Sequence, residues 1–115
     1  MPATTKYLFI ASMDVDPQFE ELFNEVYDTE HIPFLLAVPG VRAITRIKGE
    51  PFDFAIAGTV KPMPPPSPVY SAIYEVDGPE VLSSPAWAAA VERGRWPAEV
   101  RPHTNNRSSC LYRVM

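Results

Sequence analysis

Three side chains with acid–base or hydrogen-bonding chemistry, Tyr27, Asp28 and His31, fall where a long amphipathic helix is expected to end. Tyr27 and His31 are four residues apart and Asp28 and His31 are three apart, so a helix would place them on one face. A free imidazole has a pKa of about 6.5, which suits proton transfer at neutral pH. The candidate catalytic residues are therefore His31, as the proton carrier, and Tyr27, as a hydrogen-bond donor to a developing oxyanion. Asp28 is a candidate to orient the imidazole or to bind substrate.

Each of these residues also has an interpretation that involves no chemistry. A partly charged His31 would stabilise the carboxyl end of the helix through the helix dipole. Tyr27 would be an amphipathic core residue with its hydroxyl at the rim, and Asp28 a solvated carboxylate. Which interpretation holds depends on where the surrounding helices and strands place these three side chains.

Two further candidates for substrate binding are Arg46 and Tyr74. Arg42 and Arg46 are four residues apart in an alternating strand and are expected on one face of it. A guanidinium matches the geometry of a carboxylate, so Arg46 is suited to an anionic group of a substrate. The same alternation fits a solvent-facing side or a dimer-edge contact, and Tyr74 fits either a cavity wall or plain packing on the sheet.

The helix that carries the first cluster is predicted over residues 17–31, with Asp16 as N-cap and Pro17 at the first helical position. Its apolar residues recur at the three-four spacing of a core-facing stripe. Pro33 disfavours helical geometry at Ile32, so a looser turn is expected beyond it, through Leu36.

Runs rich in branched and aromatic residues predict the strands. They cover residues 6–12, 41–48, 69–76 and 108–114, with a strand-like piece over 52–60. A single helical turn is expected over 79–82, and a second helix from Ser84-Pro85 to near Gly94. Residues 61–68 hold five prolines and are predicted to form a semi-rigid loop, and residues 97–106 are loop by composition.

This order predicts an α+β fold of the ferredoxin-like βαββαβ type, in which two helices cover one face of a four-stranded antiparallel sheet. With 115 residues, the chain is expected to be a single domain, 1–115. Both faces of the predicted strands are apolar and no residues remain for further helices. A second copy of the chain would cover the apolar face of the sheet that the two helices leave exposed, so we expect a homodimer.

Composition excludes several classes of function. A net charge of −4 argues against nucleic acid or an anionic membrane as the main partner, and no apolar run is long enough to span a bilayer. One cysteine, Cys110, and no signal-peptide pattern at Met1–Lys6 favour a cytoplasmic protein. His31 and His103 lack metal-ligand spacing, and no glycine-rich phosphate loop is present, so neither a metal nor a cofactor is expected.

Two segments resemble a known family. Tyr27-Asp-Thr-Glu-His31-Ile-Pro33, followed by Leu36-Ala-Val-Pro39-Gly40-Val41, resembles the helix-end signature of EthD-like proteins in the dimeric α/β-barrel superfamily. Val81-Leu-Ser-Ser-Pro-Ala-Trp87, after a strand ending at Asp77, resembles their second half. The resemblance implies a dimer whose two sheets close into a barrel, with a cavity between the sheet and the first helix of each protomer. The segment from Phe52 to Pro68 is longer than a simple hairpin of that family requires.

Two functions follow as hypotheses. The first is a small cofactor-free enzyme that acts by proton transfer on a hydrophobic, ring-containing or polyketide-like metabolite, as an isomerase, cyclase or monooxygenase. The alternative is a non-catalytic dimeric binding or scaffold protein of EthD-like type.

Overall fold

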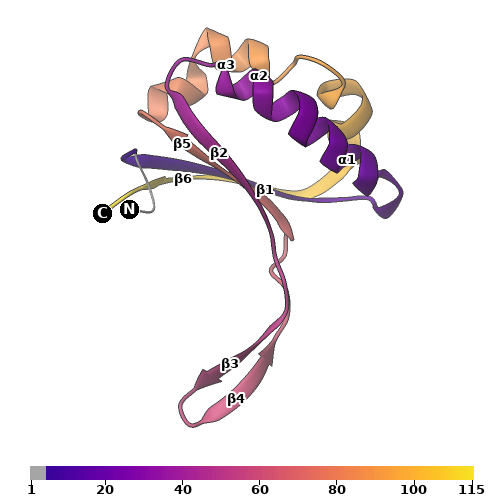
Figure 1. Cartoon of the computed structure of the whole chain (residues 1–115), viewed down its shortest axis with the longest axis vertical. Helices are drawn as coiled ribbons and strands as arrows, with labels where there is room; N and C mark the ends of the chain where they lie inside the picture. Colours follow the sequence, from indigo (N-terminus) through magenta and orange to yellow (C-terminus); the bar gives the residue numbers. More distant parts are fainter. Residues whose placement is uncertain (1–4) are drawn as a thin grey trace.

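Four antiparallel strands form the sheet on which the rest of the protein is built (Figure 1). In chain order they are β1 (Tyr7–Val15), β2 (Val41–Lys48), β5 (Tyr70–Val76) and β6 (Thr104–Arg113). Their spatial order is β2-β5-β1-β6, which is the split βαββαβ arrangement expected from the sequence. The computed structural model describes residues 5–115. The expectation that Met1–Lys6 is not a signal peptide rests mostly on residues 1–4, which lie outside the described residues.

One continuous helical segment connects β1 to β2. It consists of a 3₁₀ turn (Pro17–Phe19), α1 (Glu20–Val26), a π-helical turn (Tyr27–His31) and α2 (Ile32–Leu36). The expectation that Pro33 disrupts the helix at Ile32 is wrong, because Ile32 has helical angles of φ −61° and ψ −51°. Pro33 has no N–H to donate and its ring crowds the preceding turn, and a widened π turn just before it accommodates both effects. The N–H of Ile32 accordingly bonds to the carbonyl of Tyr27, five residues earlier.

The start of this segment differs from the sequence prediction in one respect. Pro17 lies in the first helical turn as expected, but the carboxylate of Asp16 does not cap the helix. It accepts a hydrogen bond from Asn105 Nδ2 at 3.1 Å instead and faces His103. The carboxylate therefore ties the helix start to the last strand.

The second helical region is shorter and more broken than predicted. α3 (Pro85–Ala90) follows a 3₁₀ turn (Pro79–Ser83), and the hydroxyl of Ser84 accepts the N–H of Trp87 at 3.2 Å as its cap. The helix ends before Gly94.

Residues 97–106 are not a loop, contrary to the sequence prediction. The chain forms a π-helical turn (Trp96–Val100) and a 3₁₀ turn (Arg101–His103) before β6 begins. Pro97 and Pro102 are the second residues of these turns, close enough to the start for a proline to be tolerated, so they do not prevent the helical turns.

The long insertion after β2 is a hairpin of β3 (Phe52–Ile56) and β4 (Thr59–Met63), which projects away from the helices in Figure 1. Ala57 and Gly58 both have positive φ, as a tight two-residue hairpin turn requires. The prediction of a loop over residues 61–68 is wrong for Lys61–Met63, because Pro62 lies in β4 opposite Asp53. A two-stranded sheet has only edge strands, and an edge strand admits a proline.

The core lies between the sheet and the helices. Alternating burial along β5 shows most clearly which face of the sheet packs against the helices. Its side chains Tyr70, Ala72, Tyr74 and Val76 face the helices and are buried, while the alternate residues point to the other side. That other side, which we name the open face, has no helix over it among the described residues (Figure 1). It carries Leu8, Ile10, Ile47, Ile73 and Tyr112 in register across the four strands. Within residues 5–115, no helix combines the length and apolar character needed to cross a membrane.

Candidate active site

A cavity of about 380 Å³ lies between the sheet and the helical layer. Side chains from nearly every element of the body line it. The aromatic and polar ones are Phe9, Tyr27, His31, Tyr74, Trp87, Trp96, Arg101, Arg107 and Ser109. No aspartate or glutamate is among the lining residues, so the cavity combines aromatic walls with positive charge.

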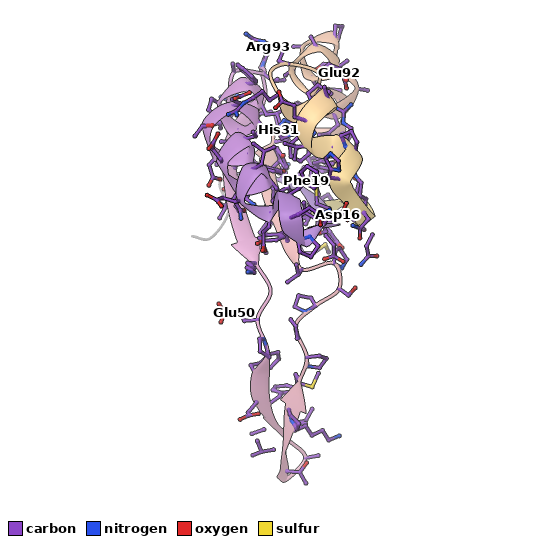
Figure 2. All side chains as sticks on the ribbon, turned by 90° about the vertical axis from the view of Figure 1, so that its right-hand side faces the viewer. Asp16, Phe19, His31, Glu50, Glu92 and Arg93 are labelled. Carbon is purple, nitrogen blue, oxygen red and sulfur yellow. The ribbon has the colours of Figure 1, made fainter. Side chains whose placement is uncertain are left out.

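His31 forms part of the wall of this cavity and is only 5% exposed. Figure 2 shows it inside the body of the protein, far from the hairpin whose base is marked by Glu50. Its Nδ1 is buried and has no hydrogen-bond partner, and no described residue donates to or accepts from its side chain. A buried polar group normally finds a partner in its own protein. The imidazole therefore has no hydrogen-bond partner among the described residues, while the His31 ring lines the cavity.

Its surroundings keep His31 uncharged. The pKa of His31 is lowered from 6.5 to about 4, first by burial and then by the positive charges of Arg101 and Arg107, with Glu92 opposing them. At neutral pH the imidazole is therefore neutral, with one ring nitrogen able to accept a proton.

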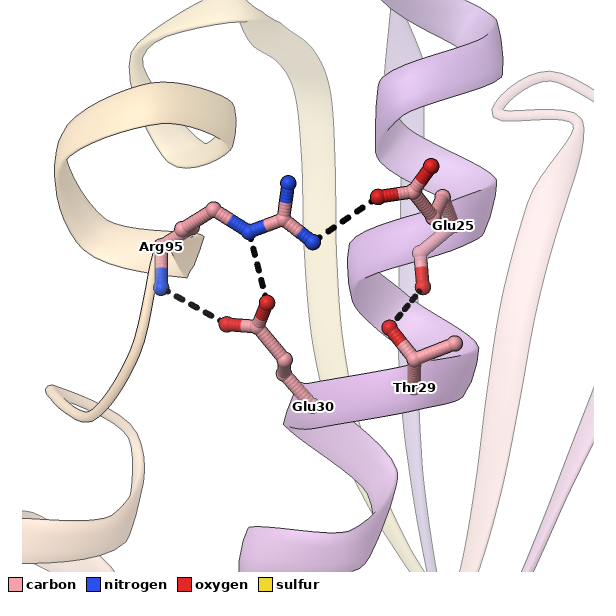
Figure 3. Close-up of polar contacts among 4 residues, drawn as sticks. All are labelled: Glu25, Thr29, Glu30 and Arg95. Atoms are coloured by element: carbon pink, nitrogen blue, oxygen red, sulfur yellow. Dashed lines mark hydrogen bonds and ion pairs between the residues drawn. The ribbon is translucent and has the colours of Figure 1, made fainter.

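Trp96 covers one face of the imidazole, with ring centroids 4.3 Å apart and planes 19° apart. The preceding residue, Arg95, bonds to two glutamates of the first helical segment (Figure 3). Its backbone N–H donates to Glu30 Oε1 at 2.9 Å and its Nε to Glu30 Oε2 at 2.6 Å, while its Nη2 reaches Glu25 at 2.8 Å. Glu30 is the neighbour of His31 in the π turn, so these bonds fix Trp96 against His31.

The hydroxyls of Tyr27 and Tyr74 are 2.7 Å apart, and both side chains are buried. The π turn places Tyr27 beside His31, with ring centroids 5.0 Å apart. Burial raises the pKa of Tyr27, and it raises the pKa of Tyr74 well above its usual value. Both phenols therefore keep their protons. Two protonated hydroxyls share one hydrogen bond, so one O–H remains free to donate.

Asp28 and Arg46 lie apart from His31. Arg46 Nη1 donates to Asp28 Oδ1 at 2.9 Å and its Nη2 to Asn24 Oδ1 at 2.8 Å, and its guanidinium sits 4.6 Å from the ring centroid of Tyr27. The Asp28 side chain is 59% exposed and does not bond to His31. Of the residues singled out from the sequence, the structure brings together His31, Tyr27 and Tyr74, while Arg46 contacts Tyr27 from the side of Asp28 and neither Arg46 nor Asp28 bonds to His31.

The expectation that Arg42 and Arg46 share one face of β2 is wrong. A bulge between Val41 and Ala43 shifts the register by one residue, and such a shift reverses the face on which a side chain lies. Arg46 faces the helices, whereas Arg42 is exposed and pairs with Asp77.

Sequence reasoning missed Arg107 and Arg101 and treated both tryptophans as packing residues. Arg101 comes from a stretch that composition assigns to a loop, and Arg107 from just before the predicted last strand. The alternation of Arg107 with Ser109 and Leu111 was the one available signal, since it puts them on one face of an extended strand. His103, the second histidine, lies outside the cavity and stacks on Phe19.

No family model and no curated protein sequence matches the chain. Solved structures do match. An EthD family protein from Bacillus halodurans is 14% identical, with a TM-score of 0.58 over 95% of this chain and 99% of that one. The heme-degrader MhuD from Mycobacterium tuberculosis, with two hemes in its active site, is 13% identical, with a TM-score of 0.59 over 95% of each chain.

A dimeric ferredoxin-like protein of unknown function from Thermobifida fusca is 13% identical, with a TM-score of 0.52 over 94% of this chain and 90% of that one. At such identities the comparisons establish the fold. The ferredoxin-like fold predicted from the order of elements is confirmed, as is the EthD-like fold that the two resembling segments implied.

Proposed function

We propose that this protein is a small enzyme that transfers a proton on a hydrophobic, ring-containing substrate without a cofactor. His31 is the general base, and the Tyr27–Tyr74 pair stabilises the oxygen on which charge develops. One observation carries the proposal: a neutral imidazole without a partner lines a cavity with aromatic walls. At about 380 Å³ the cavity lies at the small end of the usual range for ligand pockets, which favours a ligand of two or three rings.

The donors and acceptors fit the removal of a proton next to a carbonyl group. His31 accepts the proton, and the C–H electron pair moves into an enolate whose oxygen takes up the negative charge. The hydroxyl left free in the Tyr27–Tyr74 pair donates to that oxygen. Return of the proton to another carbon completes an isomerisation. In a cyclisation the enolate carbon attacks a second carbonyl of the same molecule, and the protonated His31 gives its proton to the alkoxide that forms.

Arg46 and Asp28 have a supporting role in this proposal. Arg46 lies over the ring of Tyr27 and is held there by Asp28 and Asn24. Its positive charge lowers the pKa of Tyr27 against the larger effect of burial. We assign it to positioning Tyr27 rather than to contact with the substrate.

Exchange of α-protons for deuterium in 2-tetralone, a bicyclic ketone, tests the proposal without knowledge of the natural substrate. The protein should accelerate the exchange, measured by NMR in D₂O, and His31→Ala should lower the rate by about 10²-fold or more. His103→Ala is the matched control, because it removes the other histidine, outside the cavity. Equal rates for His31→Ala and the unaltered protein would contradict the assignment. Binding of the ketone without exchange would favour the non-catalytic alternative.

Heme is a second candidate ligand. MhuD, which shares the fold, is described as a heme-degrader, and the unpartnered imidazole of His31 is a potential axial ligand of iron. Titration with hemin should then give a Soret band that shifts in His31→Ala and is unchanged in His103→Ala. Identical spectra for all three proteins would exclude His31 ligation.

We further propose that the protein is a homodimer. Support comes from the open face, where Ile47 is 48% and Tyr112 is 52% exposed, and from the dimeric protein of the same fold. The β3–β4 hairpin lies on the side of the sheet away from the helices (Figure 1). Phe52 and Phe54 on it are 54% and 44% exposed, and an isolated two-stranded hairpin is only marginally stable. Packing against a second copy would cover both surfaces.

A further inference from the structure

We infer that the ligand of this cavity is a ring-containing carboxylic acid whose carboxylate is bound by Arg107. This inference rests on the proposed function, since it names the chemical class of the substrate for the same site. It places the rings between the aromatic walls and the anionic group at the mouth of the cavity.

Arg107 is the arginine of the cavity whose charge is not compensated. Arg101, the other arginine there, forms a bidentate pair with Glu92, at 2.9 and 2.8 Å. For Arg107 the described part of the chain offers no carboxylate and no hydrogen bond. It is exposed, yet it lines the cavity and its charge acts on both His31 and Tyr27. The guanidinium is therefore close to the proposed base and to the proposed oxyanion donor.

The other lining residues define what the anion must be attached to. The cavity has no acidic residue, and the indoles of Trp87 and Trp96 provide flat apolar walls. A carboxylate fits the planar fork of a guanidinium through two parallel hydrogen bonds. The rings of an aromatic or fused-ring acid would pack against the indoles while its carboxylate pairs with Arg107. A neutral ring compound would leave Arg107 unpaired.

Binding of such an acid would also make His31 more basic. Arg107 and Arg101 both disfavour a positive charge on His31. A bound carboxylate offsets the charge of Arg107, so protonation of His31 becomes easier when the substrate is in place. The anion then makes the imidazole a stronger base only in the occupied cavity.

Binding of 2-naphthoate and of its neutral amide tests the inference. Isothermal titration calorimetry gives the affinities, and fluorescence of the only two tryptophans, Trp87 and Trp96, reports occupancy, because both line the cavity. We expect the acid to bind more tightly than the amide and Arg107→Ala to weaken binding of the acid about 10- to 100-fold. Arg107→Lys keeps the charge but loses the planar fork, so its affinity for the acid should lie between those of the unaltered protein and Arg107→Ala.

Arg113→Ala is the matched control. Arg113 lies on the same strand and on the same face, six residues further on, and does not line the cavity, so its replacement should leave the affinity unchanged. Equal affinities for acid and amide, with no effect of Arg107→Ala, would overturn the inference and leave the proposed function standing. Failure of both compounds to bind would count against the proposed function and the inference together. Loss of affinity in Arg107→Ala and Arg113→Ala alike would show a general charge effect and overturn the assignment to Arg107.

Discussion

The indole of Trp96 stacks on the imidazole of His31 at a centroid distance of 4.3 Å. This contact joins the π turn of the first helical segment to a turn that follows the second helix, and the two residues are far apart in the chain. It supplies part of the burial that keeps His31 neutral. The Arg95 bonds to Glu30 and Glu25 are what align the two segments.

Glu30→Gln should loosen this stacking. Glu30 accepts from both the backbone and the side chain of Arg95, and these bonds lower its pKa. The amide of glutamine loses one acceptor and the charge, so Trp96 should gain mobility and exposure. We expect a red shift of tryptophan emission and a lower melting temperature. Glu99→Gln, a change of the same type within the turn that carries Trp96, should alter neither.

Stability should fall as the pH drops from about 6.5 to about 4. In the unfolded chain His31 binds a proton near pH 6.5, whereas in the folded protein it remains neutral until about pH 4. The unfolded state therefore binds more protons in this window, and the free energy of unfolding decreases on acidification. The full difference in pKa of His31 corresponds to about 3 kcal/mol at pH 4 and below.

Urea unfolding at pH 7, 5.5 and 4 measures this effect. Carboxylates also titrate over the range, so the informative quantity is the difference between the unaltered protein and His31→Gln. Glutamine does not titrate, and the variant should lose less stability on acidification. Parallel curves for the unaltered protein and His31→Gln would show that His31 is not a buried neutral imidazole.

The Tyr27–Tyr74 hydrogen bond should appear in a double-mutant cycle. Either single change to phenylalanine leaves one buried hydroxyl without its partner in the protein, which costs about 1 to 3 kcal/mol. The double change removes both polar groups and should cost less than the sum of the two single changes. Chemical denaturation of the four proteins gives the coupling energy, and additive effects would contradict a direct bond.

Ile47→Lys should weaken the proposed dimer. Ile47 is 48% exposed on the open face, and a lysine in each copy would place like charges at the interface. Leu36→Lys is the control, because Leu36 is 43% exposed on the helical side. Light scattering should show a smaller species only for Ile47→Lys. A monomer already in the unaltered protein would refute the proposal.

The local sequence pattern was sufficient to predict most of the strands and helices and their order. Strand and helix periodicity, the Ser84 cap and the order of elements predicted the sheet and its helical cover, because each depends on residues that are neighbours in the chain. The pairing of Tyr27 with His31 was predictable for the same reason, since residues four apart on a helix lie on one face. Where two local rules compete, the sequence was misleading: proline disrupts a helix interior but is tolerated near the start of a helical turn, where Pro97 and Pro102 lie.

What the sequence could not determine is which distant side chains share the cavity. A one-residue bulge in β2 removes Arg42 from the face of Arg46, and Asp28 and Asn24 then engage Arg46. Tertiary packing alone brings Trp96, Tyr74, Arg101 and Arg107 around His31. The proximity of Tyr27 and His31 thus followed from the sequence, whereas the neutrality of His31, its stacking on Trp96 and its place near Arg101 and Arg107 arise only from long-range packing.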